Sequence, residues 1–260
     1  IPKFLNTLSR IFGINNFDFY STLNIPRFQN SGKIDKNYNL YVLNIQNNNW
    51  NLENLKAEYN SDFFFVDKIN CNNENVFFLA SKEDIKINYN FKVIKSLNNF
   101  TDTKPAFRAN LEICKVDGGL SSYQSEYPIK MIEKKGSVLS SIDLLTNHNA
   151  DKNYIVFKNI YSKPIKEKFE GYFIDRDNRK IIKRIQLITN LTNFIEIDNN
   201  LIGKGYYFFT KDYTGIPIFL SEHGGHLSFE HTHPPHEYIL TEDKYNRVSN
   251  MKKEFYEIVS

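Results

Sequence analysis

The first hundred residues alternate between helix-like and strand-like spacing of apolar positions. Residues 3–13 place their apolar side chains on one helical face and end at a glycine, which predicts a helix. Residues 51–59 follow an Asn-rich loop and indicate a second, short helix. Apolar runs of strand length predict strands in the same region, at 38–45, 61–69 and 74–81. The first part of the chain is therefore expected to mix helices with strands.

The pattern changes from about residue 105 onward. Short apolar runs follow one another and are separated by turn sequences such as VDGG and DRDN. In KRIQLIT (183–189), Ile185, Leu187 and Thr189 alternate with their neighbours, as in a strand with one face in solvent. Short, evenly spaced strands of this kind predict an antiparallel sandwich or barrel.

The last residues return to helical spacing. Residues 242–259 predict a helix that begins with acidic side chains, which suit a helix N-terminus. Its apolar side chains form one stripe: Tyr245, Val248, Met251, Phe255 and Val259. The stripe predicts a face that packs against the rest of the domain.

These elements predict an α+β fold that is mainly antiparallel β. A mixed N-terminal region, residues 1–104, is expected to precede a β-rich domain, residues 105–260. The second domain would be a β-sandwich or barrel-like structure that also carries the terminal helix.

Composition excludes several kinds of partner. Charged residues nearly balance, 33 − 30 = +3, and the lysines form no dense basic tract, so we expect no nucleic-acid partner. No apolar run approaches the roughly 20 residues of a spanning helix, and no signal peptide is visible. Cys71 and Cys114 stand alone and far apart, which favours a reduced, cytoplasmic setting.

Histidines are concentrated in one short stretch, SEHGGHLSFEHTHPPHEY, residues 221–238. Five of the six histidines in the chain lie here, together with three acids. The histidines are His223, His226, His231, His233 and His236, and the acids are Glu222, Glu230 and Glu237. Imidazole and carboxylate groups bind divalent transition metals when three or four of them converge.

Strand geometry suggests how the metal ligands could converge. His231 and His233 are two residues apart and would point the same way in a strand, and the following Pro–Pro pair would end that strand. His236 or His226 would supply a third ligand, while His223 lies one turn upstream. Glu230 or Glu237 would act as a general base or a fourth ligand. The sequence thus predicts a zinc, iron or manganese site.

Two other interpretations of this stretch remain open. The histidines could act as acid–base groups without a metal, because imidazole titrates near neutral pH. They could also be separate, solvated side chains of a polar turn.

A second polar stretch, GGLSSYQSEYPIKM at 118–131, predicts a place for a ligand. Tyr123, Gln124 and Glu126 would offer an aromatic face and hydrogen bonds to a sugar or a small polar metabolite. Arg108 would bind a carboxylate or phosphate through its guanidinium group. The alternative is an ordinary hairpin loop with polar side chains.

Three classes of function remain open. The first is a metal-dependent enzyme (hydrolase, lyase or isomerase) acting on a small polar or carbohydrate-type substrate through the His/Glu cluster at 222–237. The second is a carbohydrate-binding β-sandwich module with a structural metal or none. The third is a structural protein whose aromatic-rich sheets and terminal helices make subunit contacts, for example in a homo-oligomer.

Overall fold

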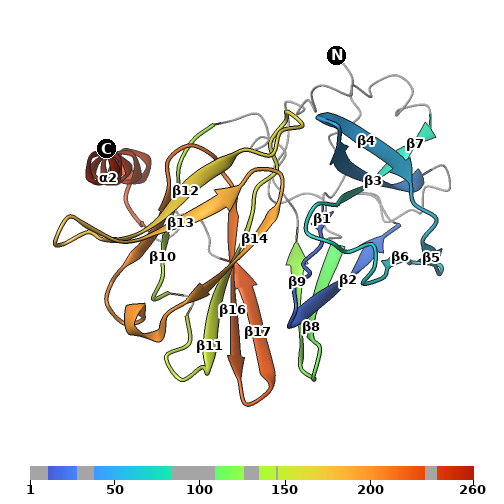
Figure 1. The fold of residues 1–260 in the computed structure, drawn as a ribbon, viewed down its shortest axis with the longest axis horizontal. Coiled ribbons are helices and arrows are strands. Elements are labelled where there is room, and N and C mark those ends of the chain that lie inside the picture. Colours follow the sequence, from blue (N-terminus) through green and yellow to red (C-terminus); the bar gives the residue numbers. More distant parts are fainter. Residues whose placement is uncertain (1–10, 28–37, 83–108, 126–134, 145, 232–238) are drawn as a thin grey trace. The chain divides into compact units, whose positions relative to one another are not determined.

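The computed structural model describes residues 11–27, 38–82, 109–125, 135–144, 146–231 and 239–260. These residues are mostly antiparallel β-structure, arranged in four small sheets, with one C-terminal helix (Figure 1). The chain divides into two compact units with two sheets each. Unit 1 comprises Ile1–Glu133, Ile160–Ile165 and Asn190–Thr192, and unit 2 comprises Lys134–Asn159, Lys166–Thr189 and Asn193–Ser260.

Unit 1 contains a four-stranded and a five-stranded sheet, both antiparallel. The four-stranded sheet has the order β1 (Ile11–Phe12), β7 (Val76–Ser81), β3 (Tyr38–Gln46) and β4 (Asn49–Asn54). The five-stranded sheet has the order β5 (Glu58–Tyr59), β6 (Phe63–Val66), β2 (Phe19–Pro26), β8 (Ala109–Lys115) and β9 (Leu120–Ser125).

The five-stranded sheet has one apolar and one polar face. Along β2, Phe19, Ser21, Leu23 and Ile25 are buried, and Tyr20, Thr22 and Asn24, which alternate with them, are partly exposed. The partner strand β8 repeats this alternation with buried Ala109, Leu111 and Ile113. Because side chains alternate across a strand, the intervening polar residues of both strands share the opposite face.

Unit 1 also holds two short segments that lie between strands of unit 2 in the sequence. The Trp50 indole Nε1 donates to the Ser162 carbonyl at 2.9 Å. The Thr192 hydroxyl donates to the Gly13 carbonyl, also at 2.9 Å. These buried bonds tie residues 160–165 and 190–192 to the strands around β1 and β4.

Unit 2 contains two four-stranded antiparallel sheets and the helix. One sheet has the order β10 (Val138–Ser141), β15 (Tyr207–Thr210), β12 (Lys168–Asp175) and β13 (Lys180–Ile188). The other has the order β14 (Thr192–Ile197), β11 (Lys152–Lys158), β16 (Ile216–His223) and β17 (His226–His231). A short 3₁₀ helix, η2 (Asn199–Leu201), follows β14, and α2 (Lys244–Val259) ends the chain.

The helix α2 packs on the first of these sheets through the predicted stripe. Phe255 is fully buried, and its ring lies 5.2 Å from that of Tyr207 and 5.5 Å from that of Phe209. Val259 belongs to the same cluster, together with Leu139, Tyr172 and Ile174. The packing face expected for 242–259 is confirmed, except that Tyr245 at its start is exposed.

The predicted α+β class is wrong. The expected helix at 51–59 is instead strand β4 and strand β5, and most of the helix expected at 3–13 lies outside the described residues. Asn47 and Asn48 both adopt positive φ, 49° and 57°, which forms a tight two-residue turn between β3 and β4. This turn sends the chain back as a strand where a loop and a helix were expected.

The expected single sandwich or barrel at 105–260 is also not what forms. The strands after residue 134 make two separate four-stranded sheets, and β8 and β9 join a sheet whose other strands come from the N-terminal part. Hydrophobic spacing identifies a strand but carries no information about its partner, so the sheet order could not be foreseen. The boundary predicted near residue 104 falls in 83–108, outside the described residues.

Within the part of the chain that the structure describes, no helix is both long and apolar enough to cross a membrane.

Candidate functional site

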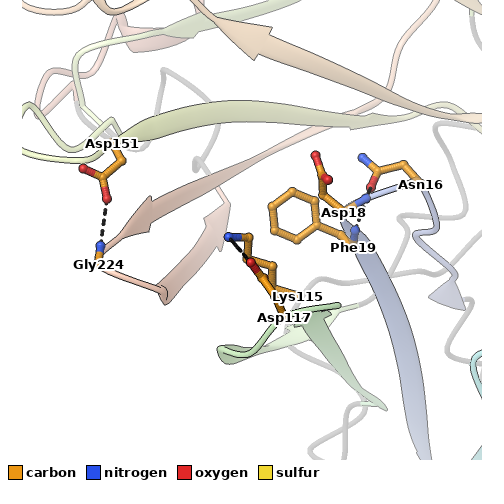
Figure 2. A network of polar contacts seen from close by, with 7 residues as sticks. All are labelled: Asn16, Asp18, Phe19, Lys115, Asp117, Asp151 and Gly224. Carbon is orange, nitrogen blue, oxygen red and sulfur yellow. Dashed lines mark hydrogen bonds and ion pairs between the residues drawn. The ribbon is translucent and has the colours of Figure 1, made fainter.

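The first two histidines of the cluster lie at a hairpin turn. Gly224 and Gly225 have φ of 53° and 82°, as a two-residue turn between β16 and β17 requires, and His223 pairs with His226 across it. The Asp151 carboxylate accepts a hydrogen bond from the Gly224 N–H at 2.8 Å (Figure 2). Its other oxygen lies 3.9 Å from the His223 Nδ1. Both side chains are well exposed, so this contact mainly orders the turn.

His231 lies at the opposite end of β17. It pairs with Ile218, five residues along the strand from His226. At about 3.3 Å per residue this separates the two backbones by roughly 16 Å, and the odd spacing turns their side chains to opposite faces. The structure therefore does not bring His223 and His226 together with His231.

Glu230 contacts the imidazole of its neighbour. A carboxylate oxygen of Glu230 lies 2.8 Å from the His231 Nδ1 and accepts the His231 backbone N–H at 2.9 Å. Glu230 is largely exposed and His231 is half-buried. A carboxylate on one ring nitrogen fixes the orientation of an imidazole and leaves Nε2 as the ring's other nitrogen.

The remaining predicted ligands, His233, His236 and Glu237, lie outside the described residues. Among the residues that are described, no three His, Cys, Asp or Glu side chains are grouped so that they could hold a metal ion. The predicted metal site of His231, His233 and His236 therefore stays a prediction.

In the polar stretch at 118–131, successive side chains of strand β9 point to opposite faces of the sheet. Tyr123 is buried and pairs with the buried Leu111, so its side chain belongs to the core face. Gln124 is exposed and pairs with Asn110 on the polar face. Arg108 and Glu126 lie outside the described residues.

The polar face of the five-stranded sheet is organised around Glu112 of β8. The Thr22 hydroxyl donates to Glu112 Oε2 at 3.1 Å, and the Asn24 side-chain amide donates to Oε1 at 3.0 Å. Both donors come from the neighbouring strand β2, where Thr22 is directly opposite Glu112. One carboxylate thus holds two polar side chains in fixed positions.

Tyr20 and Cys114 form a second pair on this face. Burial is the main cause that raises the pKa of the Cys114 thiol, and the charge on Cys114 is the main cause that raises the pKa of Tyr20. Both groups are therefore protonated at neutral pH, and the pair offers no thiolate nucleophile.

A pocket of about 460 Å³ lies within unit 1, next to Thr22 and Asn24. Strands β2 and β6 and the segment leading into β5 supply its walls. Its lining residues are Thr22, Leu23, Asn24, Leu55, Lys56, Ala57, Glu58, Phe65, Val66, Asp67 and Asn70. The volume lies within the range typical of small-molecule sites.

The pocket combines one aromatic ring with several polar groups. Phe65 is 38% exposed although it belongs to a sheet strand, and it pairs with Glu58 on one side and Asn24 on the other. Asp67 is fixed by its own turn: its Oδ1 accepts the Ile69 N–H at 3.1 Å and the Asn70 backbone and side-chain N–H groups at 2.9 Å. The walls are therefore ordered before any ligand arrives.

Two further sets of polar contacts in unit 1 stabilise turns. Asn16 Oδ1 accepts the backbone N–H groups of Asp18 and Phe19 at 2.9 and 2.7 Å, and Lys115 lies 3.2 Å from Asp117 (Figure 2). The asparagine contacts are those of an Asx turn, and the ion pair joins a half-buried lysine to an exposed aspartate in one hairpin. We assign both a structural role.

Sequence reasoning did not find the pocket. Its residues come from three separate segments, 22–24, 55–58 and 65–70, and one of these, 55–58, was expected to be helical. The usable signal was the alternation along β2, which sets Tyr20, Thr22 and Asn24 on one face. No protein-family model, curated protein or solved structure matches the chain.

Proposed function

We propose that this chain binds a small polar, carbohydrate-type molecule in the pocket lined by Asn24, Glu58, Phe65 and Asp67. The observation that carries the proposal is the partly exposed Phe65 ring within a pocket of about 460 Å³ whose other lining residues are a mixture of polar and apolar ones. A sugar ring presents an apolar face and a rim of hydroxyl groups. An aromatic side chain beside amide and carboxylate groups matches both surfaces.

Phe65→Ala is expected to weaken binding of monosaccharides about tenfold. The substitution removes the aromatic surface that the described lining residues supply, and a contact of this kind contributes roughly 1 kcal/mol or somewhat more. Binding of a panel of neutral hexoses would be measured by ligand-observed NMR and by calorimetry on wild-type and variant protein.

The matched control is Phe17→Ala. Phe17 is fully exposed on a turn of the same unit and does not line the pocket, so its removal should leave sugar affinity unchanged. Equal affinity of wild-type and Phe65→Ala protein for every sugar would contradict the proposal, as would the absence of binding to wild-type protein.

A second proposal is metal-dependent catalysis on the same class of substrate through residues 222–237. The contact between Glu230 and the His231 Nδ1 favours it, because metal-ligating histidines commonly hold a carboxylate on the nitrogen that does not face the metal. His233 and His236 would complete the ligand set for zinc, iron or manganese, and Glu237 or Glu230 would serve as base.

Metal content tests this second proposal. Untagged protein is expected to hold about one metal ion per chain by mass spectrometry, and His231→Ala/His233→Ala should lose it. The control is His223→Ala/His226→Ala, because these histidines lie at the far end of the hairpin and should not affect metal content. Metal retained without His231 and His233, or lost only with His223 and His226, would refute the placement.

We also propose a cytoplasmic location. Both cysteines are free thiols, with Cys71 buried and Cys114 partly so, which is compatible with a reducing compartment. A homo-oligomer remains an expectation that light scattering would test.

A further inference from the structure

We infer that the ligand of the unit 1 pocket carries a positive charge as well as hydroxyl groups, as an amino sugar does. The inference rests on the proposed function, since it names the chemical class of molecule for the same pocket. It follows from which hydrogen-bonding atoms of the lining residues are already engaged.

The donors on strand β2 are directed to Glu112. Thr22 gives its only hydroxyl hydrogen to Glu112 Oε2, at 3.1 Å, and Asn24 gives an amide hydrogen to Oε1, at 3.0 Å. A carboxylate can only accept, so these bonds fix the Asn24 amide with its nitrogen toward Glu112. The Asn24 Oδ1 and the lone pairs of the Thr22 hydroxyl remain as acceptors.

The opposite wall is arranged in the same way. The Asn70 side-chain amide donates to Asp67 Oδ1 at 2.9 Å, which again leaves the amide oxygen as an acceptor. Glu58 is exposed and, within the described residues, takes part in no ion pair or side-chain hydrogen bond. Asn24 and Asn70 each keep a second amide hydrogen and Lys56 is a donor, but the remaining polar groups of these side chains are acceptors, so a complementary ligand supplies most of the donors.

The charged side chains in and behind the pocket also favour a positively charged ligand. Glu58 and Asp67 line it, and Glu112 lies directly behind Thr22 and Asn24. Among the described lining residues Lys56 is the one cationic side chain, so the lining itself has two carboxylates against one ammonium group. An ammonium group on the ligand would be attracted electrostatically and would provide three hydrogen-bond donors. A carboxylate on the ligand would be repelled.

Three hexoses that differ in charge test the inference: glucosamine, glucose and glucuronate, with glucosamine kept protonated. Calorimetry on the full chain at low salt is expected to show glucosamine binding about fivefold tighter than glucose, and glucuronate weaker than either. Added salt should reduce the preference for glucosamine, because it screens exposed charges.

The variant Glu58→Gln tests whether the preference for glucosamine over glucose arises in this pocket. The substitution keeps the size of the side chain and removes one negative charge, so the ratio of glucosamine to glucose affinity should fall toward one. Asp18→Asn removes the same charge from a turn that does not line the pocket, and it should keep the wild-type ratio. Circular dichroism would verify that both variants are folded.

The outcomes separate the inference from the proposed function. If the three sugars bind wild-type protein equally, or glucuronate binds best, the charge preference is refuted while sugar binding stands. If none of the three binds, the proposed function fails and the inference fails with it. A preference for glucosamine that Glu58→Gln leaves unchanged also refutes the assignment to this pocket.

Discussion

Phe255→Ala is expected to lower the free energy of unfolding of unit 2 by about 3–5 kcal/mol. Phe255 is 0% exposed, and its ring packs against the rings of Tyr207 and Phe209 of β15. Tyr256 of the same helix packs edge-on against Phe209. Truncation leaves a cavity that the surrounding rings, fixed in a sheet, can fill only in part. Urea unfolding followed by far-ultraviolet circular dichroism measures the loss.

Two features make this measurement specific. Trp50, the single tryptophan, lies in unit 1, so its fluorescence reports that unit separately from the circular dichroism signal of the whole chain. Tyr245→Ala is the matched control, because Tyr245 is on the same helix and 64% exposed, and its loss should change stability by less than about 0.5 kcal/mol. Equal losses for the two variants would show that α2 does not pack through Phe255.

The strands that sequence alone predicts correctly are those with a strong local pattern. Residues 38–45 and 183–189 fall on β3 and β13, and on β13 the buried Leu187 lies between more exposed neighbours, as the alternation predicted. The C-terminal helix is correct for the same reason, since Val248, Phe255 and Val259 repeat at helical spacing and are buried. A pattern of this kind depends only on neighbouring residues, so it can be recognised without knowing which strand or sheet the segment packs against.

The segment after Asn48 shows where local pattern fails. Leu52 and Leu55 are three residues apart, which fits a helix, yet Trp50 and its neighbours form strand β4. The left-handed conformations of Asn47 and Asn48 close a hairpin with β3, and the Trp50 indole finds its acceptor at Ser162, 112 residues away. Tertiary pairing therefore overrides helical spacing here, and no window of sequence contains that information.

The histidine cluster and the pocket show the same limit of prediction from local sequence. Histidines that are close in sequence need not be close in space, because a strand moves the chain about 3.3 Å per residue and alternates its faces. This separates His226 from His231. Conversely, Asn24 is 34 residues from Glu58 in sequence, yet both pair with Phe65 of β6, one on each side. A pocket built across strands leaves no contiguous motif to find.

Gly215→Ala is expected to destabilise unit 2 by about 3 kcal/mol. A Cβ at this position would lie 2.3 Å from Cζ of Phe157 and 2.6 Å from the Lys158 carbonyl oxygen. The Phe157 ring cannot move aside, because it is fully buried with Phe208 packed edge-on at 5.5 Å, and the carbonyl belongs to strand β11. Relief would require β16, which begins at the next residue, to shift away from β11.

Gly136→Ala separates this steric effect from the general effect of replacing glycine. Its Cβ would meet only the Thr214 methyl group, at 3.3 Å, and a small adjustment relieves that contact. The loss of chain entropy in the unfolded state favours alanine there, so stability should change by less than about 1 kcal/mol. Thermal and urea unfolding of the two variants side by side would measure the difference. If Gly215→Ala were as stable as Gly136→Ala, the close approach of β11 to the start of β16 would be refuted.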